Sequence, residues 1–534
     1  MKNLSKNIFF IFAITLFFSS TIFSQYKIHG VVTADGESLI GATIIILENK
    51  KQAVTQMNGD YLFENIASGN YNLEVNYLGY ENYQVAINVQ GDTPLDIEIA
   101  RQVQVGELIV LATRARETTP MTYTNIKKEV LEKNNLGQDV PFLLKWSPSV
   151  VVTSDGGTGM GYTGIRVRGT DPTRINVTLN GIPLNDSESQ GVYWVDLPDF
   201  SSSTEDIQIQ RGVGTSTNGA GAFGASINLN TSKVHKKPYG KLSASLGSFN
   251  TSKKNIQFGS GLLNGKFTFD GRLSQLQSDG YIDRASVDLN SYFLSAAYIG
   301  DKTSVRLNTF SGHEITYQSW YGVPAQYVDN QELRTYNAAG TEQPDTPYDN
   351  QVDDYTQTHY QALVSHQLNG EWNFNGALHY TKGAGFYEQY KADEDFADYG
   401  LSNITFTNDT LTSTDLIRQK WLDNDFYGWT YALNYSPSRF DLTFGGAWNI
   451  YKGQHFGEII WAKYASNGAK GHRYYDNDAT KKDFNIFGKI DAQLVGKLFG
   501  YLDLQYRKVD YEFLGLDKSG KQLQESESLH FFNP

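Results

Sequence analysis

Cysteine is absent from this 534-residue sequence, which excludes disulfides, thiolate nucleophiles and cysteine-ligated metals. An excess of basic residues is also absent, since 45 Lys and Arg stand against 58 Asp and Glu. The net charge of −13 argues against general nucleic-acid binding, which needs a basic face. Long apolar runs are missing too: Ile8–Phe18 is far shorter than the roughly 20 residues of a transmembrane helix. A membrane-spanning form of this chain must therefore use a β-barrel.

Glycine and aromatic residues are abundant instead, with 50 Gly, 34 Tyr, 30 Phe and 8 Trp. So many aromatic side chains exclude global disorder and favour β structure. At the N-terminus, Lys2 and Lys6 precede the apolar run, and Ser24 stands where a signal peptidase would cut. These features predict an export signal at residues 1–24, whereas a membrane anchor would need a longer apolar run.

Residues 26–100 alternate short apolar strands with turn signals about every ten residues, which is the spacing of a β-sandwich. The expected strands include 28–32, 42–47, 61–63 and 71–75. This region resembles the carboxypeptidase-regulatory-like, transthyretin-like domain through the words Gly30-Val31-Val32, Leu39-Ile40-Gly41-Ala42, Asn58-Gly59-Asp60-Tyr61 and Ser68-Gly69-Asn70-Tyr71. The resemblance implies an accessory module with no catalysis of its own.

The pattern of residues 120–231 predicts a small mixed α/β domain. Its expected helices are 127–134 and 138–146, and its expected strands are 165–168, 174–180, 205–211 and 225–230. Asn180-Gly181 is a strong signal for a two-residue hairpin turn. The domain resembles the plug of TonB-dependent outer-membrane receptors through words in plug order: Gly164–Gly169, Ile175–Leu184, Ile207–Gly212 and Gly219–Ala225.

A tether, residues 103–119, joins these two regions. Its β-prone core consists of Glu107, Leu108, Ile109, Val110, Leu111, Ala112 and Thr113. One interpretation is a further strand of the sandwich. The other is an extended segment that adds as an edge strand to a partner's sheet. The core resembles the TonB box of the same receptors, which implies the periplasmic TonB energy-transducing complex as a partner.

Residues 232–534 alternate apolar and polar side chains in strands separated by polar loops, as in Phe440/Leu442/Phe444 and Leu502/Leu504/Tyr506. This pattern is typical of a transmembrane β-barrel, although a soluble β-sandwich gives a similar alternation. The expected fold class is therefore mainly β: an N-terminal β-sandwich, a small α/β plug, and a partial antiparallel transmembrane β-barrel. About eleven strands are expected, with a long loop at Gly312–Thr356, whereas barrels with a plugged lumen use about 22 strands. We therefore expect a chain truncated within its barrel.

Three plug arginines, Arg166, Arg168 and Arg211, are candidates for locking the plug by bidentate pairing with barrel carboxylates. The alternative is that they are ordinary solvated strand residues. Aromatic and polar residues in expected loops are ligand candidates: Gln190, Tyr193, Trp194, His313, Tyr317, Trp320 and Tyr321. Such aromatics can also be membrane-interface anchors.

Two motifs suggest enzymes but lack the right context. Gly159–Gly164 fits the dinucleotide pattern G-x-G-x-x-G, yet a strand rather than a helix follows it. His455-Phe456-Gly457-Glu458 has the H-x-x-E spacing of some zinc peptidases, but it lies in an expected glycine-rich external loop at Gly453–Lys481. We expect no catalytic residues, no metal site and no cofactor.

Taken together, the residues and the resemblance predict an importer in the cell outer membrane, in contact with outer-membrane lipid. The resemblance implies a scarce solute as cargo, with a ferric siderophore or other iron complex favoured by the phrases 180–189 and 190–198. A cobalamin or oligosaccharide importer of the same family is one alternative. A surface binding or adhesion protein built from β modules is the other.

Overall fold

The computed structural model describes residues 25–34, 36–77, 80, 82–99, 114–115, 119–215, 222–407, 409–437, 440–495, 498–516 and 521–533. The predicted signal peptide and the predicted TonB box, Glu107–Thr113, lie outside the described residues. The chain divides into two compact units, Met1–Gln104 and Val105–Pro534. Within the described residues, no helix has the length and apolar character needed to cross a membrane.

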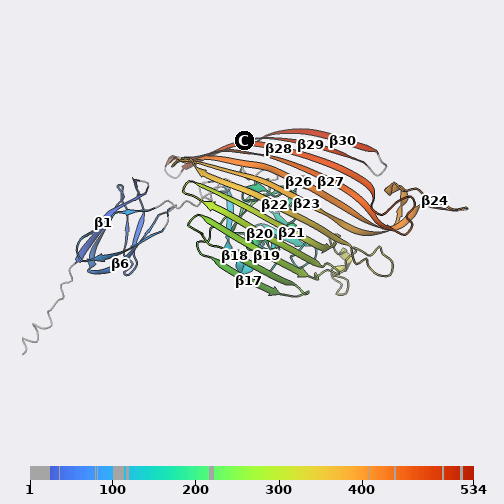
Figure 1. Cartoon of the computed structure of the whole chain (residues 1–534), viewed down its shortest axis with the longest axis horizontal. Coiled ribbons are helices and arrows are strands. Elements are labelled where there is room, and N and C mark those ends of the chain that lie inside the picture. The colour runs from blue at the N-terminus through green and yellow to red at the C-terminus, as the bar shows by residue number, and fades with distance from the viewer. Residues whose placement is uncertain are drawn as a thin grey trace, which may run out of the picture. The chain divides into compact units, whose positions relative to one another are not determined.

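The first unit is a β-sandwich (Figure 1). One sheet contains β1 (Gln25–Ala34), β2 (Glu37–Ser38), β5 (Asp60–Ala67), β8 (Thr93–Pro94) and β9 (Ile97–Glu98). The other has the order β4 (Gln52–Val54), β3 (Thr43–Ile46), β6 (Gly69–Asn76) and β7 (Tyr83–Val89). Alternate side chains of β1, β3 and β6, including Ile28, Ile44 and Leu73, are fully buried between the sheets. The predicted sandwich is confirmed.

The predicted plug is built on a mixed five-stranded sheet of order β10–β15–β16–β13–β14. The strands are β10 (Thr122–Lys127), β15 (Asp206–Arg211), β16 (Ala225–Asn230), β13 (Ile175–Leu179) and β14 (Ile182–Pro183). Asn180 and Gly181 both have positive φ, 54° and 81°, so the predicted hairpin turn between β13 and β14 is confirmed. The remaining elements are α3 (Lys128–Asn134), α4 (Val140–Leu144), the hairpin β11 (Val150–Ser154) and β12 (Thr163–Val167), and the short helices η1 (Pro172–Arg174), η2 (Trp194–Asp196) and η3 (Phe200–Ser203).

A twelve-stranded antiparallel sheet follows, in which each strand pairs with its neighbours in chain order (Figure 1). Its strands are β17 (Tyr239–Leu246), β18 (Ser252–Gly259), β19 (Phe267–Ser278), β20 (Val287–Ile299), β21 (Thr303–Tyr317), β22 (Val352–Gln367), β23 (Trp372–Asp395), β26 (Ser413–Tyr435), β27 (Phe440–Ala462), β28 (His472–Val495), β29 (Leu498–Leu516) and β30 (Gln522–Asn533). The long connections carry η5 (Ala325–Tyr327), η6 (Phe396–Tyr399), β24 (Ile404–Thr405) and β25 (Thr410–Leu411).

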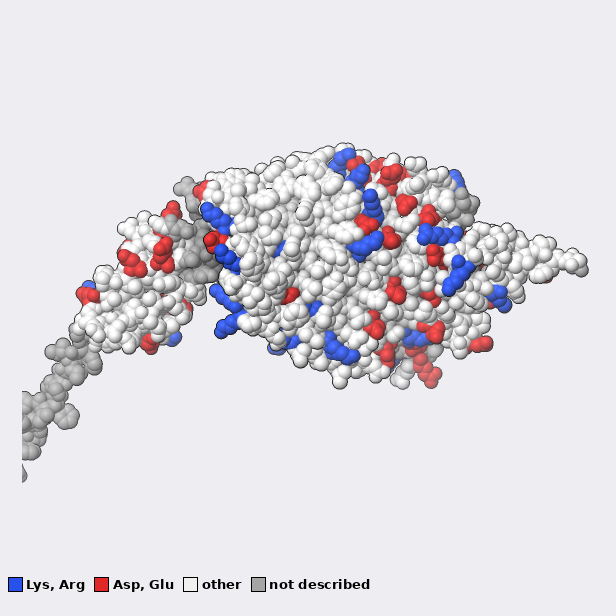
Figure 2. Space-filling view, viewed as in Figure 1, with Lys and Arg blue, Asp and Glu red and all other residues white. Residues whose placement is uncertain are grey.

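The large sheet is apolar on its outer face and polar on its inner face. On β19, Phe269 and Leu273 are 52% and 51% exposed, whereas Thr268 and Arg272 are buried. A soluble sandwich would bury the apolar set instead, so this orientation is that of a transmembrane barrel strand. Figure 2 shows a broad uncharged area over the sheet, with Asp and Glu gathered toward the end that carries β24.

Two loop predictions are wrong. The expected loop Gly312–Thr356 is shorter, because β21 continues to Tyr317 and β22 begins at Val352. The expected external loop Gly453–Lys481 is mostly strand, because β27 reaches Ala462 and β28 starts at His472. In both places polar residues such as Glu314, Gln454 and His455 interrupt the apolar–polar alternation, so the alternation no longer marks a strand there.

Candidate functional site: a cavity between plug and sheet

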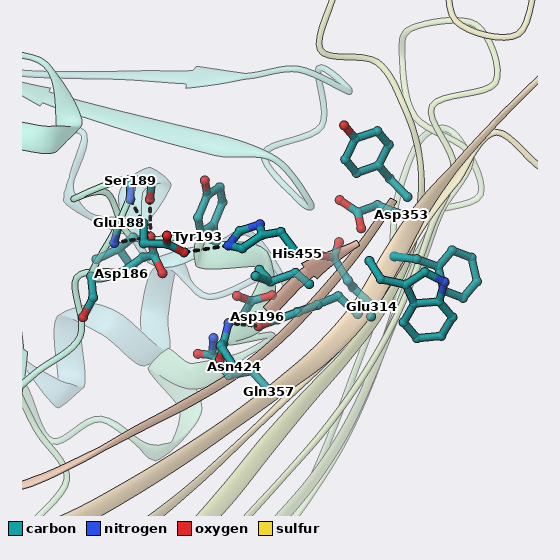
Figure 3. A pocket seen from close by; sticks show the side chains of 18 of the residues that line it. Asp186, Glu188, Ser189, Tyr193, Asp196, Glu314, Asp353, Gln357, Asn424 and His455 are labelled. Carbon is teal, nitrogen blue, oxygen red and sulfur yellow. Dashed lines mark hydrogen bonds and ion pairs between the residues drawn. The ribbon is translucent and has the colours of Figure 1, made fainter. Parts of the chain in front are cut away.

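A cavity of about 830 Å³ lies between the predicted plug and the inner face of the large sheet (Figure 3). The plug contributes Tyr162 and most of the segment from Pro183 to Leu197. The sheet contributes side chains from β21 to β28. A cavity of this size is in the range that binds small molecules.

The plug loop that enters the cavity is held in shape by its own side chains. Asn185 accepts a hydrogen bond from the Val177 amide at 2.7 Å and donates to the carbonyls of Ile175 and Gln190, both at 2.8 Å. The Asp186 carboxylate accepts bonds from the Ser189 amide at 2.6 Å and the Ser189 hydroxyl at 2.7 Å. These short-range bonds make the loop a preformed structure.

Glu188, at the tip of this loop, connects the plug to the large sheet. Its Oε2 accepts a hydrogen bond from the Tyr451 hydroxyl at 2.7 Å and lies 2.7 Å from His455 Nε2. Lys481 donates to the neighbouring Ser187 carbonyl at 2.5 Å. Burial acts to raise the pKa of Glu188, but the hydrogen bonds from His455 and Tyr451 outweigh it and lower this pKa below its usual value. The loop is thus tied to strands β27 and β28.

Three carboxylates gather on one side of the cavity: Asp196 of η2, Glu314 of β21 and Asp353 of β22 (Figure 3). Asp196 and Glu314 are buried, at 5% and 2% exposure. Burial, followed by the nearby carboxylates of Asp353 and Asp186, raises the pKa of Asp196 well above its usual value. The neutral form of Asp196 is therefore favoured unless a positive charge lies beside it.

Aromatic rings border these carboxylates. The Trp320 ring meets those of Tyr162 and Tyr387 edge to face, each with a centroid distance of 5.6 Å. The Tyr162 hydroxyl donates a hydrogen bond to Asp353. The cavity thus combines aromatic surface with acidic groups.

A second contact between plug and sheet lies at Asp199, just before η3. Its side chain is fully buried and accepts hydrogen bonds from Lys253 at 2.6 Å, Ser274 at 2.6 Å and Asn255 at 2.7 Å, all on the inner face of β18 and β19. Arg272 donates to the Asp199 carbonyl at 2.7 Å. Burial would raise the pKa of Asp199, but the charges of Lys253 and Arg272 lower it to about 2.

The predicted ligand residues have different surroundings. Tyr193, Trp320 and Tyr321 line the cavity. Trp194 instead packs in the plug core at 3% exposure. Tyr317 is buried on β21, where its hydroxyl donates to the Tyr348 carbonyl at 2.6 Å.

The remaining two ligand candidates lie outside the main cavity lining. Gln190 has φ 65° and donates to the Ser187 carbonyl at 2.7 Å, so it shapes the loop. His313 lies on β21, with Nε2 at 2.9 Å from an Asp354 carboxylate oxygen. A ligand-binding role for the seven candidates stays a prediction.

The contacts of the candidate arginines lie within the plug. Arg168 donates to the Thr122 hydroxyl at 3.1 Å, and Arg211 donates to the Pro148 carbonyl at 3.1 Å. Arg166 is an exposed residue of β12. Pairing of these three residues with barrel carboxylates stays a prediction, while the buried pairing at Asp199 has the opposite polarity: the plug supplies the carboxylate and the sheet supplies the cations.

Sequence reasoning missed Asp196, Asp199 and the pair Glu188–His455. Asp186 and Glu188 stand in the phrase Asn185–Ser189, which combines turn formers with acidic residues and was the available signal. His455 faces the cavity, while Glu458 pairs with Arg473. Among the described residues, no group of three or more His, Cys, Asp or Glu is suited to hold a metal ion. In the G-x-G-x-x-G stretch, Gly159 and Gly161 have positive φ, and the stretch runs into strand β12, which begins at Thr163, rather than into a helix.

Comparison with known proteins assigns the two domains. Residues 28–110 match the CarboxypepD_reg-like domain, and residues 115–226 match the TonB-dependent receptor plug domain. The chain carries a TonB-dependent receptor plug domain. The first match ends at residue 110, inside the predicted TonB box, so that assignment stays a prediction.

Two similar proteins are named as TonB-dependent receptors, which supports the plug assignment. TonB-dependent receptor P26 of Formosa agariphila is 27% identical over 191 residues, which is 33% of this chain and 19% of that protein. The probable TonB-dependent siderophore receptor PirA of Acinetobacter baumannii is 28% identical over 127 residues, or 22% of this chain and 17% of that protein. The matched part of this chain thus spans less than a fifth of either relative's length.

A solved structure shows the fold. FpvA of P. aeruginosa, bound to heterologous pyoverdines, superimposes with a TM-score of 0.58 at 14% identity, over 78% of this chain and 54% of that chain. TonB-dependent receptors are outer-membrane β-barrel proteins that act as transporters and not as enzymes. The plug match, the inner-polar sheet and this likeness together show that the described part of the chain has the fold of such receptors, a plug beside an antiparallel β-sheet.

Proposed function

We propose that this protein imports a scarce solute across the outer membrane with energy from the TonB complex. We propose further that this solute is a ferric siderophore or other iron complex. The observation that carries the proposal is the cavity shared by the plug and the inner face of the sheet. A ligand held there contacts both the plug, which must move during import, and the sheet, which stays in the membrane. The names of PirA and of the FpvA complex support an iron chelate as cargo.

The tether connects the predicted TonB box to the plug, so a pulling force from the TonB complex would reach the plug through it. Directly after the predicted TonB box, Arg114 pairs with Asp206 at the start of β15. The Ala115 amide donates to the Gln208 side chain at 2.8 Å, and its carbonyl accepts from the same side chain at 3.1 Å. A pull on Glu107–Thr113 would therefore act on β15, a strand near the middle of the plug sheet.

The proposal is tested by proline substitution in the predicted TonB box. Leu108→Pro removes a backbone donor that strand addition needs, so uptake of a labelled iron complex should stop while binding at the cell surface persists. Leu108→Thr keeps the donor and the β propensity and serves as the matched control. Uptake at the normal rate in the proline variant would overturn the TonB-box assignment.

A further inference from the structure

The side chains around the cavity carry unequal charge. Five carboxylates line it, from Asp186, Glu188, Asp196, Glu314 and Asp353. Two permanently cationic side chains, those of Arg418 and Lys420, line it as well. A polyanionic ligand would meet repulsion from most of this surface, whereas a cation would be attracted.

Both permanent cations are engaged by other groups. Arg418 donates to the Tyr399 hydroxyl at 2.8 Å and lies 3.7 Å from the Glu394 carboxylate. The Lys420 ammonium lies over the Tyr387 ring, 5.6 Å from its centroid. Arg418 is thus engaged by Tyr399 and Glu394 rather than by the carboxylates beside η2.

The Asp196 carboxylate is the strongest sign that a ligand group belongs there. The side chain is about 95% buried and lines the cavity, and it forms no hydrogen bond or ion pair with any described residue. The buried Glu314 accepts a bond from the Thr316 hydroxyl at 3.0 Å, and Asp353 accepts one from Tyr162. Without a partner, burial favours the neutral form of Asp196, and a positive ligand group placed beside it would stabilise its carboxylate.

The neighbouring rings define the kind of cation. Trp320 stands edge to face with Tyr162, whose hydroxyl bonds Asp353, and aromatic faces attract organic cations. A guanidinium or ammonium group could meet a ring face and a carboxylate at once. We infer that this cavity recognises a solute bearing an organic cation, a protonated amine or a guanidinium, which it holds between the Asp196–Glu314–Asp353 carboxylates and the Trp320 ring. This inference rests on the proposed function, because it assigns the cargo a charge and a functional group.

Three soluble probes of similar size test the inference: phenethylammonium, 2-phenylethanol and phenylacetate, with charges of plus one, zero and minus one. Each is titrated against the full-length receptor, purified from outer membranes in a neutral detergent, with tryptophan fluorescence as the readout. Trp320 and Trp421 line the cavity and report on binding. The cation should bind about tenfold more tightly than the alcohol, and the anion should bind most weakly.

Variants locate the effect. Asp196→Asn and Glu314→Gln should each weaken phenethylammonium binding by about threefold to tenfold and leave the alcohol unaffected. Asp301→Asn removes the same charge from an exposed turn between β20 and β21 and should change nothing. Equal binding of cation and alcohol, tightest binding of the anion, or unchanged cation binding by Asp196→Asn would overturn the inference. Full displacement of the cation by Ca²⁺ would do so as well, because the site would then take an inorganic ion.

Uptake assays separate this inference from the proposed function. If the probes fail while Leu108→Pro still abolishes uptake of the iron complex, only the organic-cation assignment falls. If the probes behave as expected while Leu108→Pro leaves uptake intact, the TonB-driven transport assignment falls. The charge of the molecule that co-purifies with the receptor, measured by mass spectrometry, provides an independent check.

Discussion

The buried contact at Asp199 leads to the most quantitative prediction. Asp199 has φ 51°, a left-handed conformation that asparagine tolerates well, so Asp199→Asn removes the charge with little change to the backbone. The substitution leaves Lys253 and Arg272, whose side chains are only 4% and 3% exposed, without their counter-charge. We expect the plug to separate from the sheet more easily.

The structure sets the size of the effect. Removing one partner of a buried ion pair costs about 3–5 kcal/mol, because the remaining charge stays buried. Asparagine keeps part of the hydrogen bonding to Asn255, Ser274 and Ser202, so we expect the lower end, about 3 kcal/mol. The depressed pKa of Asp199 adds a pH dependence: this contribution is complete above about pH 4 and is lost as the pH falls toward 2.

The assay is urea unfolding of the plug in the detergent-solubilised receptor, followed by protease sensitivity of the plug while the barrel stays folded. Asp171→Asn is the matched control, because Asp171 is an exposed plug carboxylate that lies 3.7 Å from Arg174, and its removal should leave the urea midpoint almost unchanged. In the double variant Asp199→Asn/Lys253→Met, part of the lost stability should return. A loss below about 1 kcal/mol for Asp199→Asn alone would refute the argument.

Three further predictions concern the plug. Glu188→Gln weakens the bonds to Tyr451 and His455, so amide hydrogen exchange of residues 185–191 should rise by about tenfold. Glu205→Gln, just before β15, is the comparison, and unchanged exchange in the Glu188 variant would contradict this prediction. Burial raises the pKa of Asp139 to about 8, so the free energy of unfolding of the plug should fall as the pH rises from about 4 to 8. Asp139→Asn should remove this pH dependence and stabilise the plug by about 2–4 kcal/mol at pH 7 in the same urea assay. Gly312→Ala would place a Cβ 2.1 Å from the Asp196 carbonyl oxygen; it should displace η2 and weaken binding of the cationic probe, whereas Gly488→Ala, in open space on β28, should not.

Local features of the sequence predicted the parts of the fold that local physics determines. Asn180-Gly181 specified a turn because both residues accept positive φ. The strand 225–230 was predicted with its observed bounds, since its alternating residues lie next to clear turn signals. The sequence predicts the long strands only where they have one apolar face, and their extensions, such as the part of β27 that carries His455, lack the regular alternation of a strand.

The cavity could not be predicted in the same way, because its residues come from distant parts of the chain. Glu188 meets His455 across 267 positions, and Tyr162 meets Asp353 across 191. No period or motif links such residues before the sheet is built. Tyr193, Trp320 and Tyr321 were found because aromatic residues in polar surroundings suggest contact surface, while the same reasoning also selected Trp194, which the plug core buries.

The segment Tyr193–Asp199 joins the candidate site to the buried contact with the sheet. Asp196 lines the cavity, and three residues later Asp199 is held by Lys253 and Arg272. Three residues span at most about 10 Å, so the chain between Asp196 and Asp199 is too short to absorb a large movement. A ligand that shifts η2 should therefore also move the Asp199 carboxylate. The close approach of Asp196 to Gly312 restricts this movement further, because the backbone of η2 packs directly on β21. Ligand occupancy and plug retention are therefore connected through one short piece of chain, and a change in either should be measurable at the other.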